Sequence, residues 1–472
     1  MPEEQQLSID LKKLALKIES EVLACHKKGA IQPVIELYCR KKVETLNFTP
    51  QGNIDKISIS SKPLNKVIWG REVFKYLSDS IVEIEDYKRI LEQNNQVKAE
   101  ELESFSNQII SDCLYQRLDD DRINKIIDIF LKEIYQQPIK YTLEVGIEGL
   151  LLKDIDLIEF EKDSFGFVLR RTKKQDLEKE VPYYQLNQNF NEYPPAILSI
   201  ICYEDSQSKR QCLVHKSMAI LRLFKPGGVD YIFYKTNCET ITERSRLNVG
   251  GVFSKNEIIG SPIKSYIGEE DEQKLKYFWK AIDKVLPESF YSFGEKELNH
   301  LLIAYNRYCD ALLRRLSTLE ERVATTIIGL ESLLLCENVE ISFRFRIRGA
   351  KILSFLGYSA SEVKDTLNLG YEIRSAFVHG DDSKLDKSSK KLSNKYPEKE
   401  DFLLKILDYL RILIIITFFL LEDERFLKNK NGRIIFLKED FLKLVDDSLI
   451  EKSQEDDLST ILNRALMKLG TR

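Results

Sequence analysis

The 472-residue chain has few of the residues that mark a metal-bound or disulfide-stapled protein. It contains eight cysteines, no two of them spaced as CxxC, and only four histidines. Close cysteine pairs are typical of zinc sites and redox centres, and disulfide frameworks occur in small secreted domains. We therefore predict no disulfide framework, no bound metal and a reducing compartment. Few histidines also leave few candidates for acid–base chemistry near neutral pH.

Long apolar runs, targeting signals and nucleotide-binding loops are missing as well. The most apolar stretch, 412–421, lies between Arg411 and Glu422 and is too short to span a bilayer. The polar residues 1–6 lack the apolar core of a signal peptide. No GxxxxGK[ST] or GxGxxG loop occurs, so use of ATP or a dinucleotide is not indicated. These features predict a cytoplasmic protein with no membrane span and no cofactor.

The charge balance argues against a broad, non-specific nucleic-acid coat. Lys and Arg total 71 against 75 Asp and Glu, which gives a formal net charge of −4. A nucleic-acid partner must therefore be held by a local positive patch. The 43% hydrophobic and 31% charged residues are typical of a globular protein, and the length predicts two or three domains.

The front of the chain mixes helical and strand-like periodicity. Helical spacing over 5–30 and 71–135 encloses β-branched, strand-like residues over 33–69. From 140 to 248 the pattern favours strands, and the segment 211–223 is interpreted as one of them. The Lys-Pro-Gly-Gly sequence that follows this segment is interpreted as a hairpin turn. We therefore predict a mixed, β-rich N-terminal region.

The pattern becomes helical after about Gly294. Residues 295–380 contain no proline and show long apolar patterns of period 3.6. Helices are predicted over 296–316, 317–336, 342–356, 360–379 and 399–422. The polar segment 380–398 is predicted to be an exposed, mobile connection. The fold class is therefore α+β, in four parts: a mixed region 1–140, a β-rich unit 141–290, an all-α bundle 295–425 and a helical extension 426–472.

The helix predicted over 360–379 carries a polar stripe. Four residues recur at offsets of 0, 4, 7 and 11 and so share one face: Asn368, Glu372, Ser375 and His379. Gly380 suits a helix C-cap directly after His379. Arg374 is about 140° around the helix from His379, at roughly 100° per residue. The two side chains can converge on one phosphate only if the helix end unwinds or a second copy of the helix supplies a partner.

Arginine and histidine are the residue types that RNA cleavage without a metal requires. A guanidinium gives two parallel N–H donors to a phosphate and stabilises the extra charge of the transition state. An imidazole acts as general acid or base near neutrality. RNA carries its own 2′-OH nucleophile, so DNA should be inert at such a site. The R-x4-H spacing is permissive by itself, and a surface arginine beside a capping histidine is the alternative.

Further charged residues surround this motif in the sequence. Glu331 lies on an otherwise apolar helix face, where a buried carboxylate needs a partner such as Arg348. We predict a structural role for this buried charge. Arg344, Arg346 and Arg348 form the most basic short cluster, and they either contact RNA phosphates or are solvated or paired within the protein.

One pair of residues has metal-ligand spacing. Cys212 and His215 form a CxxH, and Cys202 and Cys238 are the cysteines that could complete four ligands. A second close pair is missing, and positions three apart on the predicted strand point to opposite faces. We therefore predict structural roles for these residues and no metal site.

Residues 295–425 resemble a HEPN domain, specifically the branch of HEPN domains similar to that of the anti-phage protein ApeA. Three blocks carry the resemblance: Ile-Gly-Leu-Glu-Ser-Leu-Leu at 328–334, Ile-Ser-Phe-Arg-Phe-Arg-Ile-Arg-Gly-Ala-Lys-Ile-Leu at 341–353 and Tyr-Glu-Ile-Arg-Ser-Ala-Phe-Val-His-Gly at 371–380. The last block is the most specific, because Arg-x4-His-Gly ends a helix in the expected order after the other two.

The resemblance implies a HEPN-like helical bundle that forms homodimers and cleaves RNA without metal, leaving a 2′,3′-cyclic phosphate. It implies that Arg374 binds the phosphate and that His379 is the general base or acid. Anti-phage defence or a toxin-like role is implied, with a phage-derived trigger as a possible partner and residues 1–290 as a sensing or regulatory region by analogy. Many family members have Asn, Asp or His where this chain has Ser375. A catalytically inactive domain that dimerises or binds RNA is the alternative.

Overall fold

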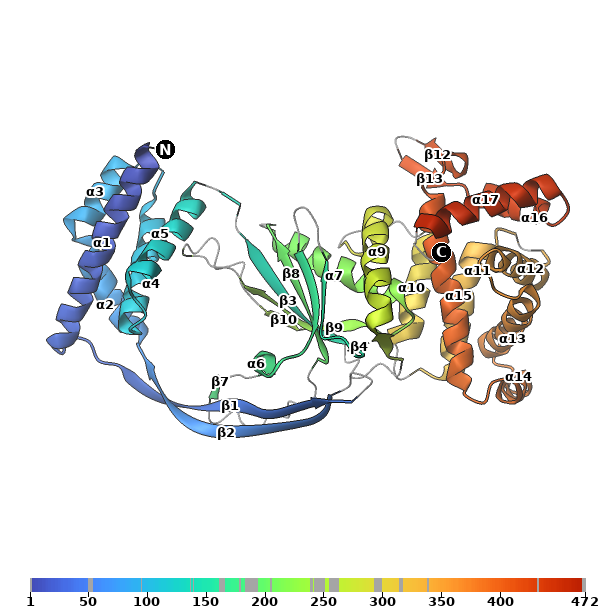
Figure 1. Ribbon diagram of the computed structural model, residues 1–472, viewed down its shortest axis with the longest axis horizontal. Helices are drawn as coiled ribbons and strands as arrows, with labels where there is room; N and C mark the ends of the chain where they lie inside the picture. Colours follow the sequence, from blue (N-terminus) through green and yellow to red (C-terminus); the bar gives the residue numbers. More distant parts are fainter. Residues whose placement is uncertain are drawn as a thin grey trace.

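A computed structural model gives the fold of the chain. It describes residues 2–49, 54–94, 96–135, 137–138, 140–160, 166–177, 180–182, 194–203, 206–237, 241, 251–253, 263–292, 299–313, 317–337, 339–430 and 433–468. These residues form a row of three parts: an N-terminal helical bundle, a β-sheet unit and a helical domain (Figure 1). The architecture is α+β, as predicted.

The N-terminal bundle contains helices on both sides of a long β-ribbon in the sequence. Its helices are α1 (Pro2–Lys27), α2 (Arg71–Val82), α3 (Glu85–Gln93), α4 (Ala99–Leu114) and α5 (Asp120–Ile134). The apolar residues of α1 recur every three or four positions and are buried: Leu7, Leu11, Leu14, Ile18 and Val22. The bundle has a hydrophobic core of its own, separate from the core of the other two parts.

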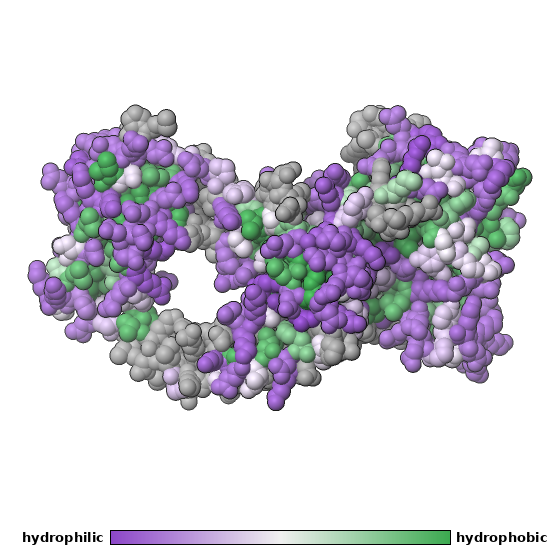
Figure 2. Space-filling view, viewed as in Figure 1, coloured by the Kyte–Doolittle hydropathy of each residue, from purple (hydrophilic) through white to green (hydrophobic). Residues whose placement is uncertain are grey.

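The ribbon consists of β1 (Val34–Phe48) and β2 (Ile54–Ile68), which pair antiparallel. This pairing confirms the strands predicted over 33–69. The short strand β7 (Glu180–Pro182) adds to β1. Figure 1 shows the ribbon running from the bundle toward the sheet, and Figure 2 shows an opening between the bundle and the sheet unit. The ribbon and the bundle therefore project from the rest of the molecule.

The second part is an antiparallel sheet with strand order β10-β9-β3-β8-β6-β5. Its strands are β3 (Tyr141–Glu148), β5 (Leu157–Phe160), β6 (Gly166–Arg171), β8 (Ala196–Cys202), β9 (Asp230–Asn237) and β10 (Gly251–Phe253). The short strands β4 (Leu150–Leu152) and β11 (Ser265–Ile267) pair in parallel beside it. The short helix α6 (Lys174–Leu177) follows β6, and α9 (Glu269–Val285) lies between the sheet and the helical domain (Figure 1).

The segment 211–223, predicted as a strand, belongs to the helix α7 (Gln207–Phe224). The prediction was wrong because the segment holds good helix formers, and its buried residues Val214, Met218 and Leu221 are spaced as on one helix face. The turn after it therefore joins a helix to β9 and is not a hairpin. Strand propensity of a few branched residues was outweighed by packing on the sheet.

The helical domain contains the helices predicted between 296 and 422. They are α10 (His300–Leu313), α11 (Leu319–Leu334), α12 (Ile341–Ser354), α13 (Ala360–Val378), α14 (Asp382–Lys395) and α15 (Lys399–Leu420). Two glycines allow α13 to pack closely. A Cβ on Gly370 would lie 2.6 Å from Ile327 of α11, and one on Gly349 of α12 would lie 2.5 Å from Leu367. The site-bearing helix is thus set tightly between α11 and α12.

The helix α14 corrects the prediction that 380–398 is a mobile connection. Asp381 caps its N-terminus by accepting a hydrogen bond from the backbone N–H of Lys384 at 3.0 Å. Ser388 and Leu392 are buried, and Leu392 is only 1% exposed. The many lysines of this segment made it look like an exposed linker in the sequence. A helix that packs only one narrow face against its neighbours needs few apolar residues, and α14 is such a helix.

The sheet unit and the helical domain share one hydrophobic core, which runs from Tyr141 to Ala465. The Arg411 guanidinium of α15 donates to the carbonyl oxygens of Leu223 and Phe224 at 2.9 and 3.1 Å, at the C-terminus of α7. The Tyr308 hydroxyl donates to the carbonyl of Arg222 nearby at 2.7 Å. The predicted boundary at 290–295 therefore marks a change in the sequence pattern, whereas the hydrophobic core continues across it.

The C-terminal extension packs back onto the helical domain. It contains a 3-10 turn (Glu424–Phe426), a hairpin of β12 (Leu427–Lys430) and β13 (Arg433–Phe436), and the helices α16 (Lys438–Asp447) and α17 (Lys452–Lys468). The apolar run 412–421 is buried over 413–420 and half-buried at its two ends, and all but its last residue belong to α15. Within the described ranges, no helix has the length and apolar character needed to cross a membrane.

Candidate functional site

The helix α13 ends where the sequence predicts. His379 is its C-cap, and Gly380 has a left-handed backbone with φ of 62°. The N–H of Gly380 donates to the carbonyl of Phe377 at 3.2 Å, and the N–H of Asp381 donates to that of Ala376 at 2.9 Å. This turn presents His379 at the surface, where its side chain is exposed.

Arg374 forms an ion pair with Glu331 of α11, with Nη2 and Oε2 3.2 Å apart. The side chains are 25% and 15% exposed. Within the described part of the chain, Nε of Arg374 is buried and has no hydrogen-bond partner. Burial raises the pKa of Glu331, and Arg374 only partly offsets that rise. The guanidinium is therefore anchored by Glu331 on one side, and its unbonded Nε is buried.

This pairing corrects the expected partner of Glu331. We predicted Arg348, but Arg348 lies on α12 and faces the C-terminal extension. Arg374 belongs to neither the polar nor the apolar face of α13 in the sequence, and the structure places α11 on its side. The predicted buried charge is present, whereas its partner depends on tertiary packing.

The polar stripe of α13 is held in a chain of hydrogen bonds. Arg346 Nη1 donates to Asn368 Oδ1 at 2.7 Å, and Asn368 Nδ2 donates to Glu372 Oε1 at 2.9 Å. Lys391 of α14 donates to the other oxygen of Glu372 at 2.9 Å. Asn368 and Glu372 therefore join three helices. These bonds hold α13 in place. Because they use polar atoms of both residues, fewer of these atoms remain to contact a substrate.

Ser375 and His379 occupy the end of the same face. The carbonyl of Ser375 accepts a hydrogen bond from the backbone N–H of His379 at 3.2 Å, and the Ser375 side chain is half-buried. His379 follows Arg374 by five residues, and no contact between their side chains is recorded among the described residues. The single chain thus presents an anchored arginine and an exposed histidine on different sides of one helix end.

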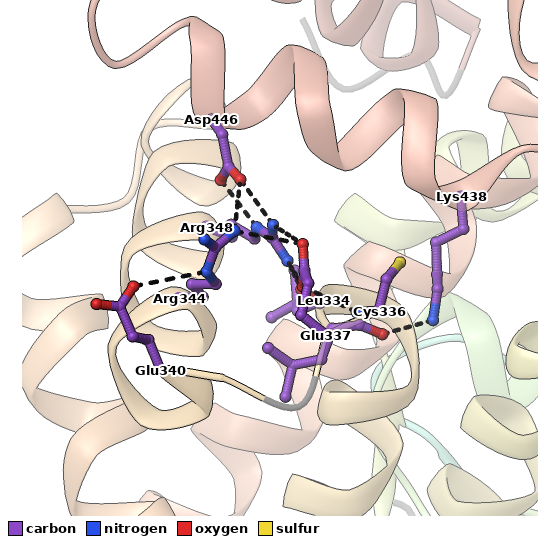
Figure 3. A network of polar contacts seen from close by, with 9 residues as sticks. Leu334, Cys336, Glu337, Glu340, Arg344, Arg348, Lys438 and Asp446 are labelled. Carbon is purple, nitrogen blue, oxygen red and sulfur yellow. Dashed lines mark hydrogen bonds and ion pairs between the residues drawn. The ribbon is translucent and has the colours of Figure 1, made fainter.

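The predicted RNA contacts Arg344, Arg346 and Arg348 are engaged within the protein. Arg348 is 1% exposed and donates to both Glu337 and Asp446 at 2.7–2.9 Å (Figure 3). Arg348 is thus buried and paired within the protein, which is the second of the two alternatives for this cluster. The sequence cluster arises because α12 faces acids on α16 and on the loop after α11.

The other two arginines of the cluster are partly exposed; Arg344 is paired with acids, and Arg346 is hydrogen-bonded to neutral groups. Arg344 lies 3.3 Å from Glu337 and 3.4 Å from Asp446. Arg346 also donates to the carbonyl of Ser342 at 2.8 Å, besides its bond to Asn368. The acids compensate the charge of Arg344, whereas Arg346, among the described residues, donates only to neutral groups and keeps its positive charge.

The CxxH pair lies on α7 and therefore shares a helix face, contrary to the predicted strand geometry. The His215 ring contacts the ring of Tyr231 edge-on, with centroids 5.5 Å apart. Cys202 is buried in the sheet, and Cys238 lies outside the described residues. Across the described residues, no three His, Cys, Asp or Glu side chains are grouped to hold a metal ion.

Comparison with protein-family models, curated proteins and solved structures finds no match to this chain. The chemistry of the site is therefore argued from its own residues. The feature that sequence reasoning missed is the Glu331–Arg374 pair, for which a lone acid on an apolar face was the only signal.

Proposed function

We propose that the chain is an endoribonuclease that cleaves RNA without a metal ion, with Arg374 and His379 as its catalytic residues. The observation that carries the proposal is the end of α13, where Glu331 anchors a partly exposed Arg374 and His379 is exposed five residues later. A fixed cation and an accessible imidazole are the groups that attack by a 2′-hydroxyl on its phosphate requires. The resemblance of residues 295–425 to ApeA-like HEPN domains favours the same pair.

The proposed reaction uses a nucleophile that the RNA supplies. The 2′-oxygen forms a bond to phosphorus, and the bond from phosphorus to the 5′-oxygen breaks. One neutral imidazole takes the proton of the 2′-hydroxyl, and one protonated imidazole gives a proton to the leaving 5′-oxygen. Arg374 stabilises the negative charge on the phosphoryl oxygens. The products are a 2′,3′-cyclic phosphate and a 5′-hydroxyl, and no water is consumed.

A dimer is part of the proposal because one chain supplies a single His379. Base and acid in the same step require two imidazoles, and a second copy provides the other. Arg374 and His379 also point about 140° apart around an ideal helix, so a partner helix helps them converge on one phosphate. Phe377 and Val378 are exposed beside His379 and offer apolar surface that a dimer can bury.

The proposal is tested by incubating the full chain with single-stranded RNA or tRNA in EDTA. We expect cleavage by the wild type and by His26→Ala, a control that removes another exposed histidine. Arg374→Ala and His379→Ala should lower the rate on the order of a hundredfold or more. A requirement for added metal, or normal cleavage by either site variant, contradicts the mechanism.

A catalytically inactive domain that holds RNA or dimerises is the second candidate, and one observation favours it. Glu331 compensates the charge of Arg374 in the single chain. The substitution Glu331→Gln separates the two candidates. If Glu331 positions Arg374 for catalysis, cleavage falls roughly tenfold as the anchor is lost. If Glu331 only blocks Arg374, RNA binding rises and no product forms.

In the cell, we infer a cytoplasmic role in anti-phage defence or toxin-like RNA degradation. Residues 1–290 would then sense a phage-derived trigger. The separate core of the N-terminal bundle supports this bundle as a distinct module, whereas the sheet unit shares the core of the helical domain. Phage plaques counted on cells that express the wild type or His379→Ala test this role. Equal protection by both proteins would show that any defence does not depend on cleavage.

A further inference from the structure

The outer surface of α14 carries segregated charge. Its sequence contains five lysines and two aspartates. At roughly 100° per residue, four of the lysines fall within about 80° of one another around the helix: Lys384, Lys387, Lys391 and Lys395. Asp382 and Asp386 lie about 140° or more from the centre of this lysine stripe. All four lysines are exposed; Lys384 and Lys391 each have one acid partner, Asp381 and Glu372, so the positive charge of the stripe is partly compensated.

The stripe begins beside the candidate site. Only Gly380 and Asp381 separate His379 from α14. From there α14 runs back along α13, because Lys391 contacts Glu372 and the Tyr396 hydroxyl lies 3.2 Å from that of Thr366. Since Glu372 and His379 share a face of α13, the stripe and His379 lie on the same side of that helix.

The length and the shape of the stripe suit an extended anion. A rise of about 1.5 Å per residue makes the stripe from Lys384 to Lys395 about 16 Å long. A single row of ammonium groups matches the backbone of one strand, whereas duplex RNA is contacted across successive grooves. Arg344 and Arg348 of α12 are paired with acids and do not form a local positive patch, whereas the stripe of α14 gathers four exposed lysines on one side of a helix.

A membrane surface is the less suitable partner. Helices that lie in a bilayer interface need an apolar face to insert. In α14 the apolar positions Leu385 and Leu392 are turned inward and pack on the domain core. Ser389 on the inner side also contacts Glu320 of α11 at 3.4 Å. The inner face of α14 is thus occupied, and its outer face is polar.

We propose that the lysine stripe of α14 binds the phosphate backbone of single-stranded RNA and delivers the strand to His379. The inference rests on the proposed function for the identity of the partner, but it concerns binding and not the chemical step. Lysines at fixed spacing neutralise successive phosphates and release their counterions, whatever the base sequence. The stripe is therefore a sequence-independent track.

The test measures binding of a fluorescein-labelled single-stranded DNA oligonucleotide to the full chain by fluorescence anisotropy. DNA has the phosphates but lacks the 2′-hydroxyl, so binding is separated from cleavage. The stripe variant combines Lys384→Gln, Lys387→Gln and Lys395→Gln, because glutamine preserves helix propensity. The matched control combines Lys274→Gln, Lys280→Gln and Lys284→Gln, three exposed lysines of α9. Circular dichroism checks that both variants keep their helices.

We expect the stripe variant to bind roughly tenfold or more weakly at low salt than the wild type or the control. The slope of log affinity against log salt should become shallower by about two, since each single-strand phosphate contact contributes about 0.7. Unchanged affinity and slope, or no binding by the wild type, overturns the inference. Binding to phosphatidylserine vesicles that is lost in the stripe variant, with oligonucleotide binding retained, assigns the stripe to membranes and also overturns it.

Failure of this inference is distinct from failure of the proposed function. Wild-type binding through the stripe without RNA cleavage keeps the track and refutes the nuclease. Cleavage at an equal rate by the wild type and the stripe variant, together with equal binding, keeps the nuclease and refutes the track.

Discussion

Two arginines of the helical domain, Arg348 and Arg374, are held in contrasting ways. Arg348 is 1% exposed, and its guanidinium donates to Glu337, Asp446 and the carbonyl of Leu334. Arg374 has one acid partner, is 25% exposed and retains an unbonded Nε among the described residues. A buried arginine with several engaged donors serves the fold, whereas a partly exposed arginine with one acid partner can bind an anion.

The Arg348 network is also the joint between the helical domain and its C-terminal extension. Asp446, which bonds to Arg348 (Figure 3), lies on α16. Lys438 of the same helix donates to the carbonyls of Ser332 and Leu335 at 3.0 and 2.7 Å. These bonds cap the C-terminus of α11, the helix that carries the partner of Arg374. Arg348 therefore helps to position α11, and α11 carries Glu331, the partner of the candidate catalytic residue Arg374.

The largest expected effect is on stability when the buried arginine is replaced. Arg348→Met leaves the partly exposed Glu337 and Asp446 without their central partner and should lower the free energy of unfolding by about 2–3 kcal/mol. Arg344→Met, at the edge of the same network, should lower it by less than about 1 kcal/mol. Urea denaturation measures both. Equal losses in the two variants would erase the distinction between a buried joint and a surface pair.

The next effect is on cleavage and not on stability. Arg374→Gln keeps hydrogen-bond donors for Glu331 but removes the charge offered to phosphate. We expect RNA cleavage in EDTA to fall about 10²–10³-fold, with a loss of no more than about 1 kcal/mol in unfolding free energy. Rates and denaturation curves are measured on one preparation. A stability loss as large as that of Arg348→Met would make Arg374 a structural residue.

A smaller effect is expected on how the stability of the Arg348 network depends on pH. The hydrogen bonds from Arg348 lower the pKa of Glu337 from 4.5 to about 2. Because the folded pKa is depressed, this stabilisation is present above about pH 4.5 and is lost as the pH falls toward 2. Glu337→Gln should therefore lose less stability between these pH values than the wild type. Parallel curves of unfolding free energy against pH would contradict the assignment.

The smallest effect concerns the cap on α11. Lys438→Met removes two hydrogen bonds to carbonyl oxygens and should lower the unfolding free energy by about 1–2 kcal/mol. Burial, and next the charge of Lys438, lower the pKa of His300 to about 4. The variant should therefore raise the His300 pKa, which an NMR titration of His300 follows. An unchanged His300 pKa in the variant would show that Lys438 does not influence His300.

Local sequence patterns predicted much of this site. The helix over 360–379, its end at Gly380 and the shared face of Asn368, Glu372 and His379 all follow from a period of 3.6 and from capping preferences. These features depend on residues within a few turns of one another. The structure therefore confirms the placement of the motif, and its catalytic role stays a prediction.

Long-range pairings were beyond the sequence patterns. Arg348 bonds to Asp446, which is 98 residues away, and Glu331 pairs with Arg374 across two helices. Which acid meets which arginine depends on how the helices pack, and charge alone leaves several partners open. The α14 lysines were assigned to a mobile connection for a related reason: their spacing becomes meaningful only once the segment is known to be helical.

The most direct test of the central claim compares two RNA strands that differ by one hydroxyl group. The cleavage position is mapped on the unmodified strand in EDTA, and the second strand carries a 2′-deoxy nucleotide immediately before the scissile bond. The account predicts cleavage of the first strand to a 2′,3′-cyclic phosphate and an intact bond at that position in the second. Equal cleavage of both strands, or no cleavage until a metal is added, would contradict it.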